Sequence, residues 1–340
     1  MIPVFKPSIK RKDMDSVLTC LVSDFIGYGE KTKEFLHLLT GFFEADHAYG
    51  FRDYSKGIGF ALDSLELEEG SRIVVSPLSP AFYFTEITSR GFEVLYADIT
   101  PSDACMDPAE LQKLMDLKPA AVLLHFPLGN IPDLEELRAV DLPVIADIST
   151  VFGTNYKGVP FSSFADILVL NLEAEGMITA GGGAAVFSST RKYSAIMKTA
   201  AQVIPEISFL TDINSSLGLI QFNQKESFLE KREAIKEIFM VSLMKGRHKT
   251  FSTKDGVLQI PFSFPVLLEG HVREVRQYAR KRGIRTHAAF EDSALARYQL
   301  DSFSCLNAGS ILKRTILFPL YPLLSKKNIE IISKVLSTLP

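Results

Sequence analysis

The stretch Pro143-Val144-Ile145-Ala146-Asp147 joins a short apolar run to an aspartate at its end. Valine and isoleucine favour strands, and a run that is apolar at successive positions is typical of a strand buried on both faces. Similar runs recur along the chain, separated by segments with helical patterns. The other strands predicted in this way lie at residues 72–75, 93–96, 121–124, 167–170 and 183–187. This alternation predicts an α/β protein whose mostly parallel sheet is covered by helices on both faces.

The pattern changes near residue 215. Apolar residues at helical spacing predict one long helix over 217–245, which would bridge to a second domain. A strand-like segment at 258–264, a basic helix at 271–282 and a last helix at 325–336 follow it. We therefore expect a large α/β domain over residues 1–225 and a small α+β domain over residues 226–340.

Composition narrows the classes of function. The 340 residues are 46% hydrophobic, and 37 basic against 40 acidic residues give a formal charge of −3. This balance favours neither a nucleic acid nor an anionic membrane as partner. The three cysteines are widely separated and form neither a disulfide framework nor a metal spacing. Without a signal-like N-terminus or an apolar run of about 20 residues, the sequence predicts a cytoplasmic globular protein with no metal site.

The ends of the predicted strands carry the candidate chemistry, because ligands of open α/β sheets bind beyond the carboxyl ends of the strands. Asp147 ends one strand and His125 another. Taken alone, each is more often structural: aspartate as a turn or capping residue, histidine as a hydrogen-bonded core residue. Glu173 and Glu175 share a loop, where solvation is the usual state and paired acid–base work is the alternative. No Lys-Ser/Thr follows the glycines at 181–183, which favours a hairpin over a phosphate loop.

The basic run between residues 273 and 285 lies on and just after a predicted helix. The chain is acidic overall, and the run has no interleaved aromatic platform. A solvated helix face is therefore a better interpretation than a nucleic-acid interface.

In their order along the chain, several segments resemble the DegT/StrS-type sugar aminotransferases, a family of pyridoxal-phosphate (PLP) enzymes. The matching segments are residues 2–7, 26–29, 144–147, 156–158, 164–166, 182–183 and 317–322. Segment 283–287 corresponds to a region that contacts the sugar in relatives. The resemblance covers nearly the whole chain. It implies the PLP-transferase fold type I, a nucleotide-sugar ligand and a homodimer with sites at the subunit boundary.

The resemblance assigns roles to residues 147 and 175. Asp147 matches the aspartate that faces the ring nitrogen of the cofactor and keeps it protonated. The family's lysine precedes the second glycine of the pair by eight residues, which is Glu175 here; a one-residue gap would place it at Gly176. Neither residue has the primary amine that a Schiff base needs. No lysine lies between Lys157 and Lys192, so no covalently held PLP is expected.

The phosphate site departs as well. Asp53-Tyr54-Ser55 stands where the family has Ser-Gly-Thr at a helix start. Tyr54 adds bulk and Asp53 adds negative charge where a glycine would let backbone amides approach phosphate. Ser55 keeps a hydroxyl and Lys56 adds a cation, so these two are candidates for residual anion binding.

The remaining cofactor-pocket candidates come from three further positions of the resemblance. Phe82 lies near the aromatic residue that stacks on the ring. Thr150 replaces a glutamine, and Asn171 replaces a serine that helps to hold the phosphate. The segment that a partner subunit would contribute is not recognisable around residues 209–214.

Three hypotheses follow. In the first, the chain no longer transaminates and binds a nucleotide sugar or a protein partner, or serves as a structural subunit beside an active homologue. In the second, it is an aminotransferase or dehydratase-type enzyme that uses PLP or pyridoxamine phosphate, with Glu175 as its base. In the third, an ordinary aminotransferase takes its lysine from elsewhere, such as Lys56 or Lys157. Departures at several independent positions favour the first.

Overall fold

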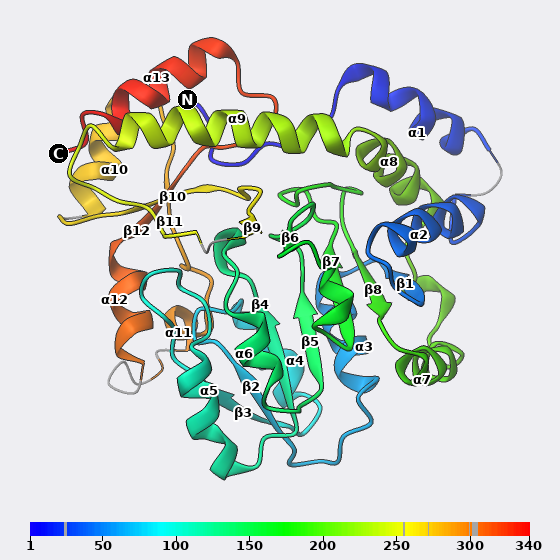
Figure 1. Ribbon diagram of the computed structural model, residues 1–340. Coiled ribbons are helices and arrows are strands. Elements are labelled where there is room, and N and C mark those ends of the chain that lie inside the picture. The colour runs from blue at the N-terminus through cyan, green and yellow to red at the C-terminus, as the bar shows by residue number, and fades with distance from the viewer. Residues whose placement is uncertain (24–25, 254–255, 271, 299, 301–304) are drawn as a thin grey trace.

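The computed structural model describes residues 1–23, 26–253, 256–270, 272–298, 300 and 305–340. Its centre is a seven-stranded sheet with the order β1-β8-β7-β5-β4-β2-β3 (Figure 1). Five neighbouring strands pair in parallel, and β8 pairs antiparallel with both β7 and β1. The strands are β1 (His47–Phe51), β2 (Arg72–Val75), β3 (Glu93–Tyr96), β4 (Ala121–His125), β5 (Val144–Asp147), β7 (Ile167–Asn171) and β8 (Ala184–Ser188). The predicted strands and the mostly parallel sheet are confirmed, and β1 is an addition.

Helices cover both faces of this sheet, as the sequence predicts. Alternate strand residues enter two separate cores, so that Ile145 packs in one and its neighbour Ala146 in the other. The first core also holds residues of α3 (Tyr54–Asp63), α4 (Ala81–Thr88) and α7 (Arg191–Ala201). The second holds residues of α2 (Glu30–Phe42), α5 (Pro108–Leu114) and α6 (Leu134–Arg138). The near-continuous apolar strands are thereby buried on both sides.

The loop between β7 and β8 is a glycine-dependent hairpin, which agrees with the sequence-based interpretation. Gly183 has a φ of 101°, a conformation that L side chains rarely adopt. A Cβ there would lie 2.3 Å from the carbonyl oxygen of Phe51. The Glu173 carboxylate accepts a hydrogen bond of 3.1 Å from the Gly183 amide. Glu173 therefore braces this loop.

The long helix predicted over 217–245 is wrong in one respect, because the structure has two helices there. They are α8 (Asp212–Asn223) and α9 (Lys225–Leu243), and Gln224 between them has a ψ of 4°. The Gln224 side chain donates to the Asp13 carboxylate at 3.0 Å and accepts from the Lys10 ammonium at 3.1 Å. These contacts tie the break in the helix to the N-terminal segment.

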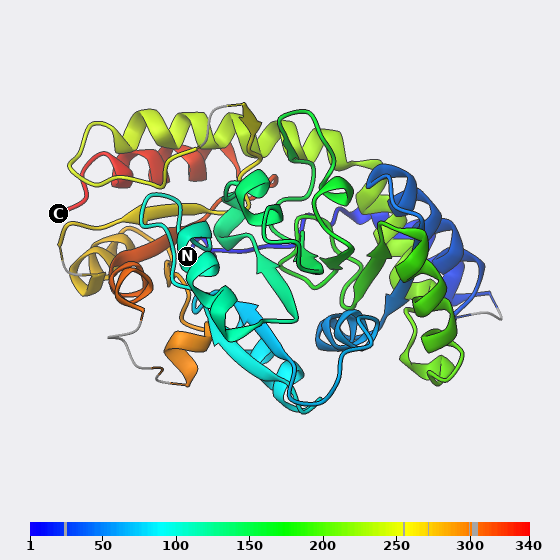
Figure 2. The same ribbon diagram turned by 60° about the horizontal axis from the view of Figure 1, so that its bottom comes forward.

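A three-stranded antiparallel sheet organises the C-terminal part. It consists of β10 (Phe264–Leu267), β12 (Thr315–Phe318) and β11 (His287–Ala288). Helix α10 (Val272–Lys281) lies beside it, and α9 and α13 (Lys326–Leu336) run side by side above it (Figures 1 and 2). The basic and last helices are thus as predicted, although His271 lies outside the described residues. Ile2 bridges to Ile284 in this part, and the domain boundary at residue 225 stays a prediction.

The strand predicted over 258–264 is wrong. Val257 and Leu258 form β9, which pairs with β6 (Asn155–Tyr156), and β10 begins only at Phe264. Pro261 lies between the two strands and has no amide to donate to a ladder. Within the described residues, no helix is long and apolar enough to cross a membrane.

Candidate functional site

The carboxyl ends of the parallel strands meet at one edge of the large sheet. His125 at the end of β4 lies opposite Asp147 at the end of β5. Asn171 at the end of β7 lies opposite Ala184, where the antiparallel β8 begins. Segments from both parts of the chain close over this edge: the Ala81 amide donates to the Asp292 carbonyl at 2.8 Å. This edge is the crevice in which a ligand is expected.

Asp147 is the centre of a hydrogen-bond cluster at this edge, and its side chain is buried at 1% exposure. One carboxylate oxygen accepts from the Tyr83 hydroxyl at 2.5 Å and from the Tyr54 hydroxyl. The other accepts from the Ser149 amide at 3.1 Å and from the Ser149 hydroxyl. Both oxygens are therefore satisfied by the chain itself, as a buried carboxylate requires.

Two helix starts deliver the tyrosines of this cluster. Tyr54 is the first residue of α3, and Tyr83 lies in the first turn of α4 beside Phe82. Burial, reinforced by the Asp147 charge, raises the pKa of both tyrosine hydroxyls well above the ordinary 10.0. Both hydroxyls stay protonated near neutral pH and serve as donors. The sequence predicted that the Phe82 ring would stack on a cofactor. In the structure it packs edge-on against the Tyr54 ring, with 4.9 Å between the ring centroids.

The N-terminus of α3 is also occupied by the chain itself. Asp53 caps the helix: its carboxylate accepts from the Lys56 amide at 3.1 Å and from the Ser55 hydroxyl at 2.5 Å. The Ser55 hydrogen bond is the main cause that lowers the pKa of Asp53. A helix N-terminus favours an anion, and Asp53 supplies one. Ser55 is thus engaged with Asp53, and the Lys56 side chain is exposed.

Two further predicted pocket residues are held by local contacts. The Asn171 side-chain oxygen accepts from the Glu173 amide at 2.6 Å, which turns it onto its own loop. The Thr150 hydroxyl donates to the Phe126 carbonyl. Of these two, only Thr150 lines an open cavity at this edge of the sheet.

An open cavity of about 230 Å³ lies beside the Asp147 cluster. Glu175, the residue at the predicted lysine position, is exposed and lines it, together with His125 and Thr150. The His125 Nδ1 atom is buried and has no hydrogen-bond partner within the described residues. Burial lowers the pKa of His125, so this ring is neutral at pH 7. Aromatic side chains of Phe5, Phe262 and Phe290 complete the walls.

Sequence reasoning brought Asp147, Phe82, Thr150 and Glu175 to this region, but it did not anticipate Tyr83 as a partner of Asp147. The only signal for Tyr83 in the sequence was that it follows Phe82 directly. Neighbouring residues at a helix start point to different sides, so Tyr83 can reach Asp147 while Phe82 faces Tyr54. Tyr54 was expected merely to add bulk.

The comparisons with known proteins establish the family and the fold of this chain. The model of the DegT/DnrJ/EryC1/StrS aminotransferase family matches residues 7–337. The chain therefore belongs to this family. The mostly parallel seven-stranded sheet flanked by helices, with a small antiparallel sheet beside it, is the PLP-transferase fold type I.

Two curated relatives and one solved structure illustrate the similarity. GDP-perosamine synthase of Escherichia coli O157:H7 is 25% identical over 70% of this chain and 70% of its own length. UDP-4-amino-4,6-dideoxy-N-acetyl-beta-L-altrosamine transaminase of Campylobacter jejuni is 24% identical over 79% of this chain and 77% of its own length. A putative sugar aminotransferase from Streptococcus pneumoniae, solved in its PLP form, matches with a TM-score of 0.91, 20% identity and coverage of 99% and 97%.

The groups that the family resemblance assigns to a PLP-type cofactor already have partners within the chain. The Asp147 oxygens that would face a ring nitrogen already accept from Tyr54, Tyr83 and Ser149. The Asp53 carboxylate holds the helix N-terminus that would bind a phosphate. Among the residues that the structure describes, no lysine lines the cavity beside Glu175. Lys157, an alternative amine, pairs instead with the Glu135 carboxylate at 2.9 Å.

Proposed function

We propose that this chain is a sugar-aminotransferase-like protein without lysine-dependent transamination, and that it binds a nucleotide sugar in the cavity beside Glu175. The observation that carries the proposal is the Asp147 cluster, in which Tyr54 and Tyr83 take the oxygen that a cofactor ring would need. The replacement of the lysine by Glu175 supports the same conclusion independently.

The ligand class is supported by the relatives and by the cavity. The names of the two curated relatives specify a GDP-linked and a UDP-linked sugar. The cavity combines aromatic walls, such as Phe5 and Phe262, with the polar groups of Glu175, His125 and Thr150. Apolar walls with a few placed polar groups are typical of small-molecule sites. A sugar ring presents both a hydrophobic face and hydroxyl groups to such a lining.

A second candidate is an enzyme that uses pyridoxamine phosphate with Glu175 as general base. The exposed Glu175 carboxylate favours it, since it lines a cavity and has no hydrogen bond or ion pair within the described residues. The occupied Asp147 and the Asp53 charge at the helix start oppose it. The third hypothesis, an ordinary aminotransferase, has the least support, because neither Lys56 nor Lys157 lines the cavity.

The decisive experiment titrates purified protein with PLP and pyridoxamine phosphate, followed by absorbance, calorimetry and borohydride reduction. In parallel, UDP-N-acetylglucosamine and GDP-mannose serve as nucleotide-sugar probes. We expect neither cofactor to bind saturably, no PLP to be fixed by borohydride, and at least one sugar nucleotide to bind. Glu175→Gln should weaken sugar-nucleotide binding by several-fold, because one polar group of the site changes. Glu237→Gln, an exposed change on α9 away from the cavity, is the control.

Each contrary outcome has a definite meaning. PLP fixed by borohydride would overturn the proposal and support the ordinary aminotransferase. Saturable binding of pyridoxamine phosphate, with turnover lost in Glu175→Gln, would support the second candidate. If no sugar nucleotide binds, the ligand assignment is wrong.

We also propose that the chain forms a homodimer, in the cytoplasmic location expected from its sequence. Exposed apolar side chains in the segment that follows α7 support an interface, with Val203 at 85% and Ile207 at 72% exposure. Exposed apolar groups that cluster mark interaction surfaces. Light scattering should give twice the chain mass for the unsubstituted protein. Val203→Asp with Ile207→Asp should give the monomer, whereas Thr199→Asp on the exposed side of α7 should leave the dimer intact. A monomeric unsubstituted protein would contradict this proposal.

A further inference from the structure

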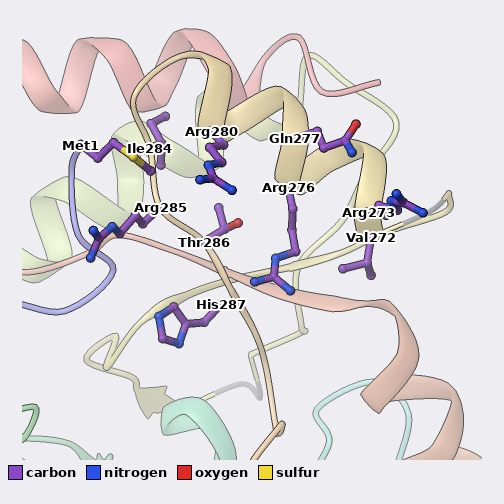
Figure 3. Close-up of a pocket in the computed structure, with 10 residues that line it drawn as sticks. All are labelled: Met1, Val272, Arg273, Arg276, Gln277, Arg280, Ile284, Arg285, Thr286 and His287. Atoms are coloured by element: carbon purple, nitrogen blue, oxygen red, sulfur yellow. The ribbon is translucent and has the colours of Figure 1, made fainter.

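A second, larger cavity lies on the C-terminal part of the molecule. Its volume is about 670 Å³, and it opens between α10 and the segment that leads into β11 (Figure 3). Four arginines line it: Arg273, Arg276 and Arg280 from α10, and Arg285 from the following segment. In Figure 3 the side chains of Arg276 and Arg280 extend from the helix toward the segment 284–287. From the sequence alone, these residues indicate only a solvated helix face.

The spacing of these arginines explains why they share one cavity. Residues 273, 276 and 280 are three and four apart, which places them on one face of a helix. Val275 and Ala279 on the opposite face are buried in the core of the C-terminal part. The register of the helix is thus fixed by its apolar side, and the basic side must face the cavity.

The positive charge in this cavity is uncompensated. No aspartate or glutamate is among its described lining residues. Within the part of the chain that the structure describes, none of its four arginines has an ion pair. The chain as a whole carries a formal charge of −3. Concentrating four unpaired guanidinium groups in a concave site raises the local potential for an anion.

The two cavities meet at one residue. His287 lines both the basic cavity and the smaller cavity beside Glu175. It begins β11, where its pairing with Leu317 of β12 fixes its position. A ligand with two chemically different ends, joined at the level of His287, would fill both cavities at once.

We infer that the basic cavity binds the diphosphate group of a nucleotide sugar whose sugar lies in the cavity beside Glu175. This inference rests on the proposed function and names the residues that would select its ligand. Planar guanidinium groups match phosphate oxygens in bidentate fashion. Met1, Val272 and Ile284 supply apolar lining for the nucleoside beside them. The diphosphate thus provides the affinity at α10, and the sugar end lies near the Asp147 edge of the sheet.

The test uses calorimetry of the full chain with two probes, inorganic pyrophosphate and UDP. Arg276→Ala combined with Arg280→Ala should weaken both probes by roughly 10- to 100-fold, since hydrogen bonds to charged groups contribute strongly and each tenfold corresponds to about 1.4 kcal/mol. The matched control is Lys281→Ala combined with Arg282→Ala. It removes the same charge from the last residue of α10 and the residue after it, but neither residue lines the cavity, and Arg282 lies over the Tyr278 ring. We expect this control to change affinity by less than about threefold.

Two outcomes would overturn the inference: absence of pyrophosphate and UDP binding by the unsubstituted chain, or equal losses in the two double variants, which would indicate a diffuse charge effect. Stronger arginine-dependent binding of a short RNA than of UDP would also overturn it. All four substituted side chains are exposed, so the variants should fold, and circular dichroism checks this.

Comparison with UDP-N-acetylglucosamine separates this inference from the proposed function. If UDP binds through Arg276 and Arg280 but the sugar adds no affinity, the sugar site of the proposed function fails while the anion site stands. If UDP-N-acetylglucosamine binds and the arginine variant binds it equally well, the anion site fails while the proposed function stands.

Discussion

Asp53→Ser, Tyr54→Gly and Glu175→Lys, introduced together, are expected to give a protein that retains PLP after borohydride reduction, whereas the unsubstituted chain retains none. The three positions are among those at which the resemblance predicts a departure from the family's cofactor site. The fraction of protein that carries reduced, covalently bound PLP is expected to rise from none to a substantial value. Mass spectrometry of the peptide that contains residue 175 measures it directly.

Each substitution removes one physical obstacle. Tyr54→Gly removes one of the two tyrosine donors to the Asp147 oxygen and leaves Tyr83 as the other, and it opens the space that the Tyr54 ring fills. Asp53→Ser keeps a good helix cap while it removes the carboxylate from the start of α3. Glu175→Lys supplies the primary amine that a covalent link needs, at a position that already lines the open cavity.

The control for this prediction is Glu175→Lys alone. It carries the amine, but Tyr54 and Asp53 still occupy the sites of ring and phosphate, so little PLP should be retained at residue 175. If the single variant is labelled as fully as the triple one, Tyr54 is not the barrier and the description of the Asp147 cluster as a closed site is wrong. Circular dichroism of all variants shows whether the Tyr54→Gly change leaves the fold intact.

The large sheet was predictable because its signal is local. Runs such as residues 144–147 are apolar at successive positions, and burial on both faces requires this. Strand β1 escaped prediction because His47 and Gly50 interrupt its apolar pattern. The break between α8 and α9 escaped it too, since the contact of Gln224 with Asp13 joins residues that are 211 positions apart.

The candidate site was predictable only in part, for the same reason. The absence of a lysine near residue 175 is a property of spacing, and the position of Asp147 follows from the end of a strand. The bond between Tyr54 and Asp147 spans 93 positions, and that between Tyr83 and Asp147 spans 64. Nothing in either local sequence indicates such a contact. It requires the helix starts of α3 and α4 to meet over the same edge of the sheet.

Two of the positions at which the sequence differs from the family pattern, residues 53 and 54, lie in the same part of the molecule. Residues 53 and 54 are neighbours, and the resemblance places both at the helix start that would bind the cofactor's phosphate. The Asp53 carboxylate takes the helix N-terminus and the Tyr54 hydroxyl takes Asp147. A buried aspartate that has no cofactor needs other donors, and Tyr54, Tyr83 and Ser149 supply them. In this interpretation Asp147 is retained because it organises the core at the sheet edge.

Asp147→Ala should therefore lower the free energy of unfolding by roughly 3 to 5 kcal/mol, which is large for a single substitution. The change leaves the two tyrosine hydroxyls and the Ser149 hydroxyl without their acceptor inside a buried site. The chain has no tryptophan, so unfolding in urea is best followed by circular dichroism. Asp147→Asn keeps the shape and one acceptor oxygen, and it should cost less than half as much. Equal stability of Asp147→Ala and the unsubstituted chain would contradict the cluster.

Alkaline pH gives the same cluster a second, independent readout. The folded pKa values of Tyr54 and Tyr83 are raised above the ordinary 10.0. Below pH 10 folded and unfolded tyrosines both hold their protons, so this contribution to stability is fully present. As pH rises above 10, the unfolded tyrosines ionise first and the free energy of unfolding falls. Burial, the larger cause of the raised pKa values, persists in Asp147→Ala, while the charge of Asp147 is gone. The folded tyrosines of that variant should therefore ionise at a lower pH than in the unsubstituted chain, as followed by the absorbance of tyrosinate. Ionisation at an unchanged pH would show that Asp147 does not act on these tyrosines.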